Sequence, residues 1–292
     1  MKNRTLARVV ASIPTSDGAG VKLRRSIGAQ RVERVDPFLM LDEFASDSAD
    51  DYIAGFPSHP HRGFETVTYM LDGHMQHRDH LGNTGDLVPG AVQWMTAGRG
   101  IVHSEMPQQS EGRMRGFQLW INLPAKEKMR PAAYRDVAPT EIPVVEHDGT
   151  RVKIIAGTYA HGTDETDGPI NPRAKRISTD PTYFDVELAP GARFEHRLDP
   201  AYNAFVYPYE GTAVISEGEE AQVLRRHEAG VLSSGERIVL RAGSDGARVL
   251  VLAGKPIGEP IVQYGPFVMN TREEIERAVL DFQSGAFTAP AS

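Results

Sequence analysis

Short runs of Val, Ile, Tyr and Phe, separated by Gly, Asp, Asn and Pro, recur along most of the chain. These runs have the length and composition of β-strands, and the residues between them are typical of turns. Many strands at short, regular spacing predict an all-β fold of sandwiches or barrels, not strand–helix–strand units. The expected strands are Glu65–Leu71, Ala91–Met95, Arg115–Ile121, Val152–Ile155, Tyr183–Leu188, Ala204–Tyr209, Ala213–Ser216, Arg237–Arg241 and Arg248–Leu252.

Turn-forming residues lie between these runs. Asp148-Gly149 and Glu210-Gly211 are dipeptides that favour chain reversal, so we expect a turn at each. The longer polar stretch Ala160–Arg173 contains Gly and Pro and is predicted to be a surface loop.

The clearest helix signal comes near the end of the chain. Thr271 and Glu274 have the spacing of a capping box, which satisfies free backbone N–H groups at a helix start. Ile275 and Val279 then lie on one apolar stripe, and Gly285 is placed to end the helix. A C-terminal helix therefore follows the strands.

The order of elements repeats weakly between the two halves of the chain. In the second half, Ala189-Pro190-Gly191 leads to Phe194-Glu195-His196 and a strand, but His196 has no histidine partner two residues away. We therefore predict two barrels, of which only the first binds metal. The predicted domains are residues 1–138, with the metal, and residues 139–292, with the C-terminal helix.

Composition limits the classes of function. The 292 residues carry a net charge of −7 with both signs mixed along the chain, which argues against direct nucleic-acid binding. The absence of cysteine excludes disulfides and thiolate metal ligands. No apolar run approaches the roughly 18 residues of a membrane span, and the N-terminus lacks a signal-peptide pattern. We expect a soluble, cytoplasmic protein without a membrane partner; a nuclear location is the alternative in a eukaryote.

Two short pairs of metal-ligand residues carry the strongest chemical signal: His59-Pro60-His61 and His103-Ser104-Glu105. Residues two apart on a strand point to the same face, so each pair aims two ligands at one side of a sheet. If the two strands are neighbours, three imidazoles and one carboxylate converge. Such a set suits a first-row transition metal with open positions for substrate or O₂.

Three more histidines, His74, His77 and His80, recur at every third residue around Asp72-Gly73. A second metal site is one interpretation of this pattern. Because the residues are spread across a predicted turn, we expect a solvated rim instead.

Four segments of the chain have a specific sequence pattern: Pro37-Phe38-Leu39-Met40-Leu41-Asp42-Glu43-Phe44, His59-Pro60-His61-Arg62-Gly63-Phe64-Glu65-Thr66, Gln93-Trp94-Met95-Thr96-Ala97-Gly98-Arg99-Gly100-Ile101-Val102-His103-Ser104-Glu105 and Tyr264-Gly265-Pro266-Phe267-Val268-Met269-Asn270. Together they resemble the pirin family of the cupin superfamily. The resemblance extends from near the N-terminus to the last helix, and it implies a bicupin of two face-to-face, jelly-roll-type β-barrels with one metal in the N-terminal barrel.

The resemblance also implies a ligand set of His59, His61, His103 and Glu105 around non-haem iron, most simply Fe²⁺. Nickel, cobalt, manganese and copper are compatible with the same donors. The general cupin pattern instead takes a glutamate soon after the histidine pair, which here is Glu65. In that case Glu105 would be a free carboxylate in the pocket.

The activity implied by the resemblance is a flavonol (quercetin) 2,3-dioxygenase that uses O₂, opens the ring and releases carbon monoxide. Glu105 would accept the proton of the substrate 3-hydroxyl as a catalytic base. A cupin enzyme with another small substrate is a second interpretation. A third, from a different class, is a non-enzymatic iron-dependent or redox-sensing regulator that binds a transcription or metabolic partner protein. Two barrels within one chain favour a monomer.

Overall fold

The computed structural model describes residues 1–28 and 34–287. The chain forms two compact units, and neither is continuous in sequence. What we call the first unit comprises Pro14–Arg25, Phe38–Pro139 and Ile257–Ser292; the second unit comprises Met1–Ile13, Ser26–Pro37 and Thr140–Pro256.

The two units are not divided at a single position, as the predicted domains are. The predicted boundary at 138/139 lies beside the junction of Pro139 and Thr140, but Met1–Ile13 and Ser26–Pro37 belong to the second unit and Ile257–Ser292 to the first. At the N-terminus, Leu6–Ala11 pairs with a strand of the second unit. Near the C-terminus, Phe267 forms a β-bridge with Arg62 in the first unit. These segments pair with strands that are distant in sequence, so a single domain boundary could not separate the two units.

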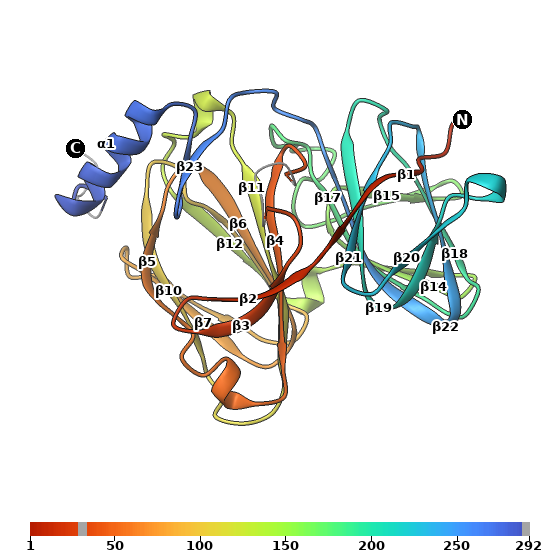
Figure 1. The fold of residues 1–292 in the computed structure, drawn as a ribbon, viewed down its shortest axis with the longest axis horizontal. Helices are drawn as coiled ribbons and strands as arrows, with labels where there is room; N and C mark the ends of the chain where they lie inside the picture. Colours follow the sequence, from red (N-terminus) through yellow and green to blue (C-terminus); the bar gives the residue numbers. More distant parts are fainter. Residues whose placement is uncertain (29–33, 288–292) are drawn as a thin grey trace. The chain divides into compact units, whose positions relative to one another are not determined.

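Two sheets make up most of the first unit and form opposing layers (Figure 1). The larger contains β2 (Ile13–Asp17), β3 (Val21–Arg25), β4 (Phe38–Ser46), β6 (Phe64–Asp72), β9 (Val92–Thr96), β11 (Met114–Asn122) and β12 (Ala133–Val137) in the order β12-β9-β6-β11-β4-β3-β2. The smaller contains β5 (Phe56–His61), β7 (Met75–Asp79), β8 (Thr84–Leu87) and β10 (Ile101–Pro107) in the order β5-β10-β7-β8.

Apolar side chains from both sheets fill part of the space between these layers. Phe44, Met70 and Met114 of the larger sheet pack with Met75 and Leu87 of the smaller one, and all five are buried. Removing this apolar surface from water is the main force that holds the layers together. Elsewhere in the unit, buried polar side chains that include His61, His103 and Glu105 lie beside further apolar clusters.

The second unit is built on one nine-stranded sheet. Its strands are β1 (Leu6–Ala11), β13 (Val144–His147), β14 (Thr150–Ala156), β17 (Thr182–Leu188), β18 (Arg193–Arg197), β19 (Asn203–Ile215), β20 (Gln222–Arg225), β21 (Glu228–Leu232) and β22 (Arg237–Gly254). The path runs β1-β21-β19-β22-β17-β14-β13, with β18 on β22 and β20 on β19. A large apolar cluster that includes Phe184, Phe194 and Ile238 forms its core.

All nine predicted strand segments lie within or almost wholly within strands, but four of them merge into two long strands. The turn predicted at Glu210-Gly211 is wrong: both residues lie inside β19, which continues through register shifts on either side of them. Gly211 has a φ of 64°, a conformation that glycine adopts without strain. The dipeptide therefore marks a β-bulge that bends one strand.

The loop predicted at Ala160–Arg173 is only partly a loop. It begins within a separate two-stranded hairpin of β15 (Thr158–His161) and β16 (Asp164–Asp167). The turn predicted at Asp148-Gly149 is confirmed: it joins β13 to β14, and both residues have positive φ, 44° and 75°. Two successive positive φ values are typical of a tight hairpin turn.

The C-terminal helix is confirmed as α1 (Arg272–Gln283), which follows the hairpin of β23 (Val262–Tyr264) and β24 (Phe267–Met269) (Figure 1). Thr271 accepts a hydrogen bond from the backbone N–H of Glu274, and the Glu274 side chain returns one to the cap, which completes the capping box. The short 3₁₀ helices are η2 (Ala49–Asp51), η3 (Ala125–Glu127), η4 (Pro139–Glu141) and η5 (Gly218–Glu220).

The predicted all-β fold is confirmed, with one correction: the sheets form sandwich-like layers and do not close into complete barrels. Within residues 1–28 and 34–287, no helix is long and apolar enough to cross a membrane.

Candidate metal centre

Adjacent strands of the four-stranded sheet bring together the two predicted ligand pairs, His59-Pro60-His61 and His103-Ser104-Glu105. β5 and β10 are antiparallel neighbours, and His103 lies directly opposite His59 in their register. His61 is two residues further along β5, so its side chain leaves the same face of the sheet. The prediction that these strands are neighbours is confirmed, and three imidazoles share one surface.

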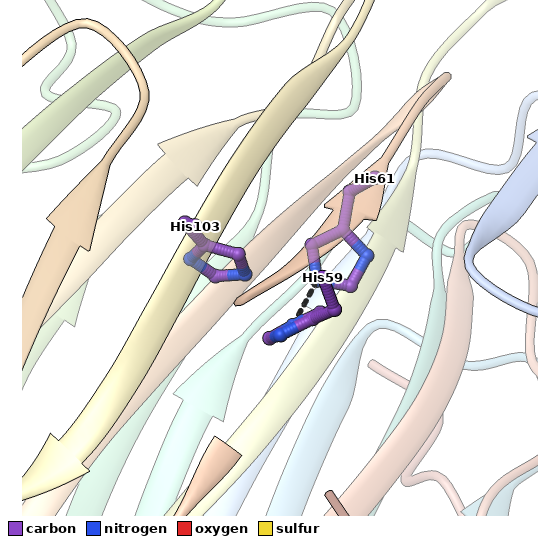
Figure 2. Close-up of side chains that lie close together, drawn as sticks. All are labelled: His59, His61 and His103. Atoms are coloured by element: carbon purple, nitrogen blue, oxygen red, sulfur yellow. Dashed lines mark hydrogen bonds between the residues drawn. The ribbon is translucent and has the colours of Figure 1, made fainter. Parts of the chain in front are cut away.

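The three rings lie within contact distance of one another (Figure 2). Each offers a nitrogen atom, and these three atoms all lie within 4.8 Å of one another. Nε2 of His59 is 3.0 Å from Nε2 of His61, and the ring centroids of His59 and His103 are 4.4 Å apart. His61 and His103 are buried, whereas His59 is partly exposed. The group is therefore open to solvent on the His59 side.

The backbone fixes which nitrogen of His59 faces the group. Nδ1 of His59 is 2.8 Å from the carbonyl oxygen of Pro57. Because a carbonyl can only accept, Nδ1 must carry the proton and donate it. In the neutral ring, Nε2 then carries a lone pair toward His61.

His103 has a histidine partner behind it. Its Nδ1 is 3.1 Å from Nδ1 of His77, which lies on the next strand, β7, opposite Glu105. The Nε2 atom of His103 is buried and has no hydrogen-bond partner in the described structure. If Nδ1 donates to His77, Nε2 presents its lone pair to the group, as a metal ligand must.

The solvated rim predicted for His74, His77 and His80 is wrong for His77, which is fully buried. His74 is exposed and lies 2.9 Å from Asp86, and Nδ1 of His80 accepts the backbone N–H of Val102. The spacing of every third residue did not predict which histidine is buried. Strand pairing, and not the local repeat, determines which side chain points inward.

Burial keeps the inner histidines neutral. It lowers the pKa of His61 well below the ordinary value for histidine, and the nearby His59 lowers it further. Burial likewise lowers the pKa of His103 well below its ordinary value, with His61 as the next contributor. A neutral imidazole has the free lone pair that coordination needs, so these shifts suit a metal site.

The carboxylate of Glu105 is buried but does not belong to the close group of donor atoms. Its Oε1 lies 3.0 Å from the hydroxyl of Thr68, which is also 2.5 Å from Oε1 of Gln118. Glu105 leaves β10 on the same face as His103, two residues away.

Glu65, the alternative carboxylate, is also outside the close group. Its Oε1 accepts a 2.7 Å hydrogen bond from Thr96, and burial raises its pKa. Oε2 of Glu65 is buried without a hydrogen-bond partner. The three histidine nitrogens already lie close together. Neither carboxylate lies with them, so the binding of an ion would determine which one completes the ligand set.

Aromatic rings flank the histidine group. Phe64 and Trp120 stack obliquely on each other, and their centroids lie 5.2 and 5.4 Å from that of His61. Trp120 is partly exposed and Phe64 fully buried. Together they make one side of the site flat and apolar.

The residues fit a divalent transition metal. Two nitrogens bound at right angles to one ion at about 2.1 Å would be about 3.0 Å apart, which matches the 3.0 Å between Nε2 of His59 and Nε2 of His61. The buried, unpartnered Nε2 of His103 is the kind of atom that an ion would satisfy. Imidazole nitrogens suit iron, nickel, copper and zinc, and do not select among them.

Comparison with known proteins gives consistent matches over most of the chain. Residues 20–121 match the family described as Pirin, and residues 183–288 match the Pirin C-terminal cupin domain. The chain is 55% identical over 273 residues to a Pseudomonas aeruginosa protein named "Putative quercetin 2,3-dioxygenase", covering 93% of this chain and 94% of that one. It is 40% identical over 278 residues to human pirin, covering 94% and 91% of the two chains.

Solved structures show the same fold. A crystal structure described as quercetin 2,3-dioxygenase from Acinetobacter baumannii matches with a TM-score of 0.86 and 31% identity, covering 98% of this chain and 99% of that one. A bacterial pirin from Escherichia coli, solved in complex with nickel(II), matches with a TM-score of 0.64 and 17% identity, covering 85% and 99%. At that identity, the second match supports the fold alone.

Proposed function

Because this chain belongs to the pirin family, we propose that it is a metal-dependent dioxygenase that cleaves flavonols such as quercetin at the 2,3-position with release of carbon monoxide. The carrying observation is the group of three imidazoles on neighbouring strands, open to solvent on one side. The names of the relatives from Pseudomonas aeruginosa and Acinetobacter baumannii support the choice of substrate.

His59, His61 and His103 would hold the metal, which we propose to be Fe²⁺, and Glu105 would complete the set. The Glu105 carboxylate accepts a hydrogen bond from the Thr68 hydroxyl at 3.0 Å, and it would turn from there toward the histidines to bind the ion. A bound divalent ion would lower the pKa of a hydroxyl coordinated to it.

The chain's own residues would handle substrate and proton. Glu105, at the inner side of the group, would accept the proton of the flavonol 3-hydroxyl, and Thr68 would orient the carboxylate. Trp120, partly exposed and 5.4 Å from His61, offers a flat surface for an aromatic substrate.

The test is turnover in air by apo protein reloaded with Fe²⁺, Ni²⁺, Co²⁺, Mn²⁺ or Cu²⁺ separately. Quercetin loss is followed by absorbance and carbon monoxide by a haem-protein trap. His103→Ala removes one ligand, and His74→Ala, an exposed histidine outside the group, is the matched control.

Metal-dependent turnover that His103→Ala abolishes and His74→Ala retains would establish the oxygenase and identify the working ion. Stoichiometric metal binding with no turnover by any ion would overturn the proposal, and would favour a metal-switched interaction with a partner protein or another small substrate.

A further inference from the structure

We propose a second site for a divalent first-row transition metal, on the surface of the second unit, formed by His147, Asp148 and His161. Each of these residues offers one donor atom, and the three atoms lie within 4.8 Å of one another. The site is distinct from the histidine group of the first unit and does not depend on the proposed dioxygenase activity.

Two separate hairpins bring the donors together. His147 is the last residue of β13, and Asp148 is the first residue of the tight turn that follows. The positive φ of Asp148, 44°, is part of that turn and holds its carboxylate beside the strand end, where Oδ2 is 3.9 Å from Nδ1 of His147. His161 comes from the end of β15.

The two imidazoles are already in contact. The rings of His147 and His161 are stacked, with centroids 3.6 Å apart and planes 13° from parallel. The lone pairs of a histidine ring lie in the plane of the ring, so one of the two stacked rings must turn before both can bind one ion.

Tyr159 is placed to orient His147. Nε2 of His147 is 2.8 Å from the hydroxyl of Tyr159, whose ring is buried against Phe194. When Nε2 carries the proton and donates it to this hydroxyl, Nδ1 presents its lone pair on the side of Asp148. Histidine ligands of metals usually donate their second ring N–H in this way, which fixes the tautomer.

Coordination needs only a small adjustment of exposed side chains. Donor atoms bound to one ion at about 2.1 Å are at most about 4.2 Å apart. The three donor atoms, which now lie within 4.8 Å of one another, must therefore move slightly closer. Asp148 is 91% exposed and His161 is exposed, so both can turn freely. Rotation of the exposed His161 side chain about χ1 and χ2 would take its ring out of the stack.

The surroundings favour a cation. His147 and Asp148 lie at the wall of a cavity of about 700 Å³ within the second unit. Its lining carries five carboxylates and two guanidinium groups, from Glu146, Asp148, Glu187, Glu210, Asp245, Arg151 and Arg248. An excess of negative charge around a cavity raises the local concentration of cations.

Two histidines and one carboxylate leave positions open for water or a further ligand. Nitrogen and carboxylate donors of this kind suit Zn²⁺, Ni²⁺ and Cu²⁺. The absence of cysteine limits the site to these harder donors. We expect weaker binding than at the first unit, because two of the three donors are exposed and must be ordered.

The test is Zn²⁺ binding by the full-length protein, measured by equilibrium dialysis with metal analysis. It is done in the His103→Ala background, which weakens the first-unit group. Adding His161→Ala should lower the remaining Zn²⁺ affinity at least about 10-fold. Adding His74→Ala, an exposed histidine beside Asp86 without a second imidazole, should leave it unchanged.

Tyr159→Phe keeps the buried ring and removes the hydroxyl 2.8 Å from Nε2 of His147. It should weaken Zn²⁺ binding by about 10-fold and change the ¹⁵N shifts of the His147 ring, which report the tautomer. A Zn²⁺ isotherm that His161→Ala leaves unchanged would overturn the proposal. So would the lack of any Zn²⁺ binding in the His103→Ala protein.

Discussion

The histidine group of the first unit and His196 of the second show two outcomes for imidazoles inside β-sheets. In the first unit, neighbouring strands supply three rings, and His77 and Thr68 add polar partners around them. In the second unit, His196 stands alone on β18. It lies against Phe184 and Tyr159, and its Nδ1 has no hydrogen-bond partner among the described residues.

The difference lies in what the adjacent strand provides. β10 brings His103 to the position opposite His59, so a shared cation can satisfy buried nitrogens. β22 brings Ile238 opposite His196, and the surrounding interior is apolar. A buried imidazole without partners stays neutral, and burial, followed by the charge of Arg4, lowers the pKa of His196 to about 4. Inside these two units, buried imidazoles thus form a close group where two ligand-bearing strands pair, and His196 has no such neighbour.

The largest expected effect comes from His103→Ala. It should disrupt metal binding by the histidine group of the first unit and leave the surroundings of His196 in the second unit unchanged. Loss of one of three imidazoles should lower metal affinity by more than 100-fold, since even loss of an outer partner costs about 10- to 100-fold. Retained metal after dialysis measures this directly. Both tryptophans, Trp94 and Trp120, lie in the first unit, so their fluorescence reports any change there. Undiminished retention would contradict the assignment.

The next effect separates the two carboxylates. We expect Glu105→Gln to lower metal affinity on the order of 100-fold, because it removes the negative charge two residues from His103. Glu65→Gln should change it little, since Glu65 lies on β6 of the larger sheet and not on a strand that carries one of the three histidines. Calorimetric titration with Fe²⁺ or Ni²⁺ compares the two matched variants. The reverse order would make Glu65 the ligand.

His77→Phe tests whether the partner behind His103 matters. The substitution keeps a buried ring but removes the nitrogen 3.1 Å from Nδ1 of His103. Metal affinity should fall by about 10- to 100-fold, and the ¹⁵N shifts of the His103 ring should show a changed tautomer mixture. An unchanged affinity with unchanged shifts would mean that His77 only fills space.

The smallest expected effect is the pH dependence of stability that His196 contributes in the second unit. The pKa of His196 is about 4 when folded and about 6.5 when unfolded, so the unfolded state binds the proton first as the pH falls below about 6.5. This group's contribution to stability is therefore lost between about pH 6.5 and 4, by on the order of 1 kcal/mol at pH 5.5.

His196→Leu should remove that part of the pH dependence. Urea unfolding at pH 7.5 and 5.5, followed by far-UV circular dichroism, measures it, and tryptophan fluorescence of the same samples separates out the first unit. An equal loss of stability at pH 5.5 in wild type and variant would show that other groups carry the dependence.

Much of the site was predictable because its signal is local. Alternation along a strand places His59 and His61 on one face whatever the strand pairs with. The capping box at Thr271 and Glu274 is likewise set within one turn of chain. The family resemblance then supplied the expectation that the two pairs meet, and the register of β5 and β10 confirmed it.

The remaining features depend on contacts between distant segments. The burial of His77 follows from the pairing of β7 with β10, and the hydrogen bond of Glu105 follows from β6 in the facing sheet. The hairpin that carries His161 was expected to be a loop, because polar strands with little apolar alternation resemble loops in sequence.

The sequence by itself determined the all-β class, the C-terminal helix and which side chains of each pair share a face, since these depend on backbone geometry over a few residues. Only the tertiary structure decided which strands are neighbours. That choice assigned the terminal segments to their units, placed His77 behind His103, kept both carboxylates outside the close group and brought His161 onto His147. Each of these is a contact across many residues, and its register is fixed by burial and pairing together.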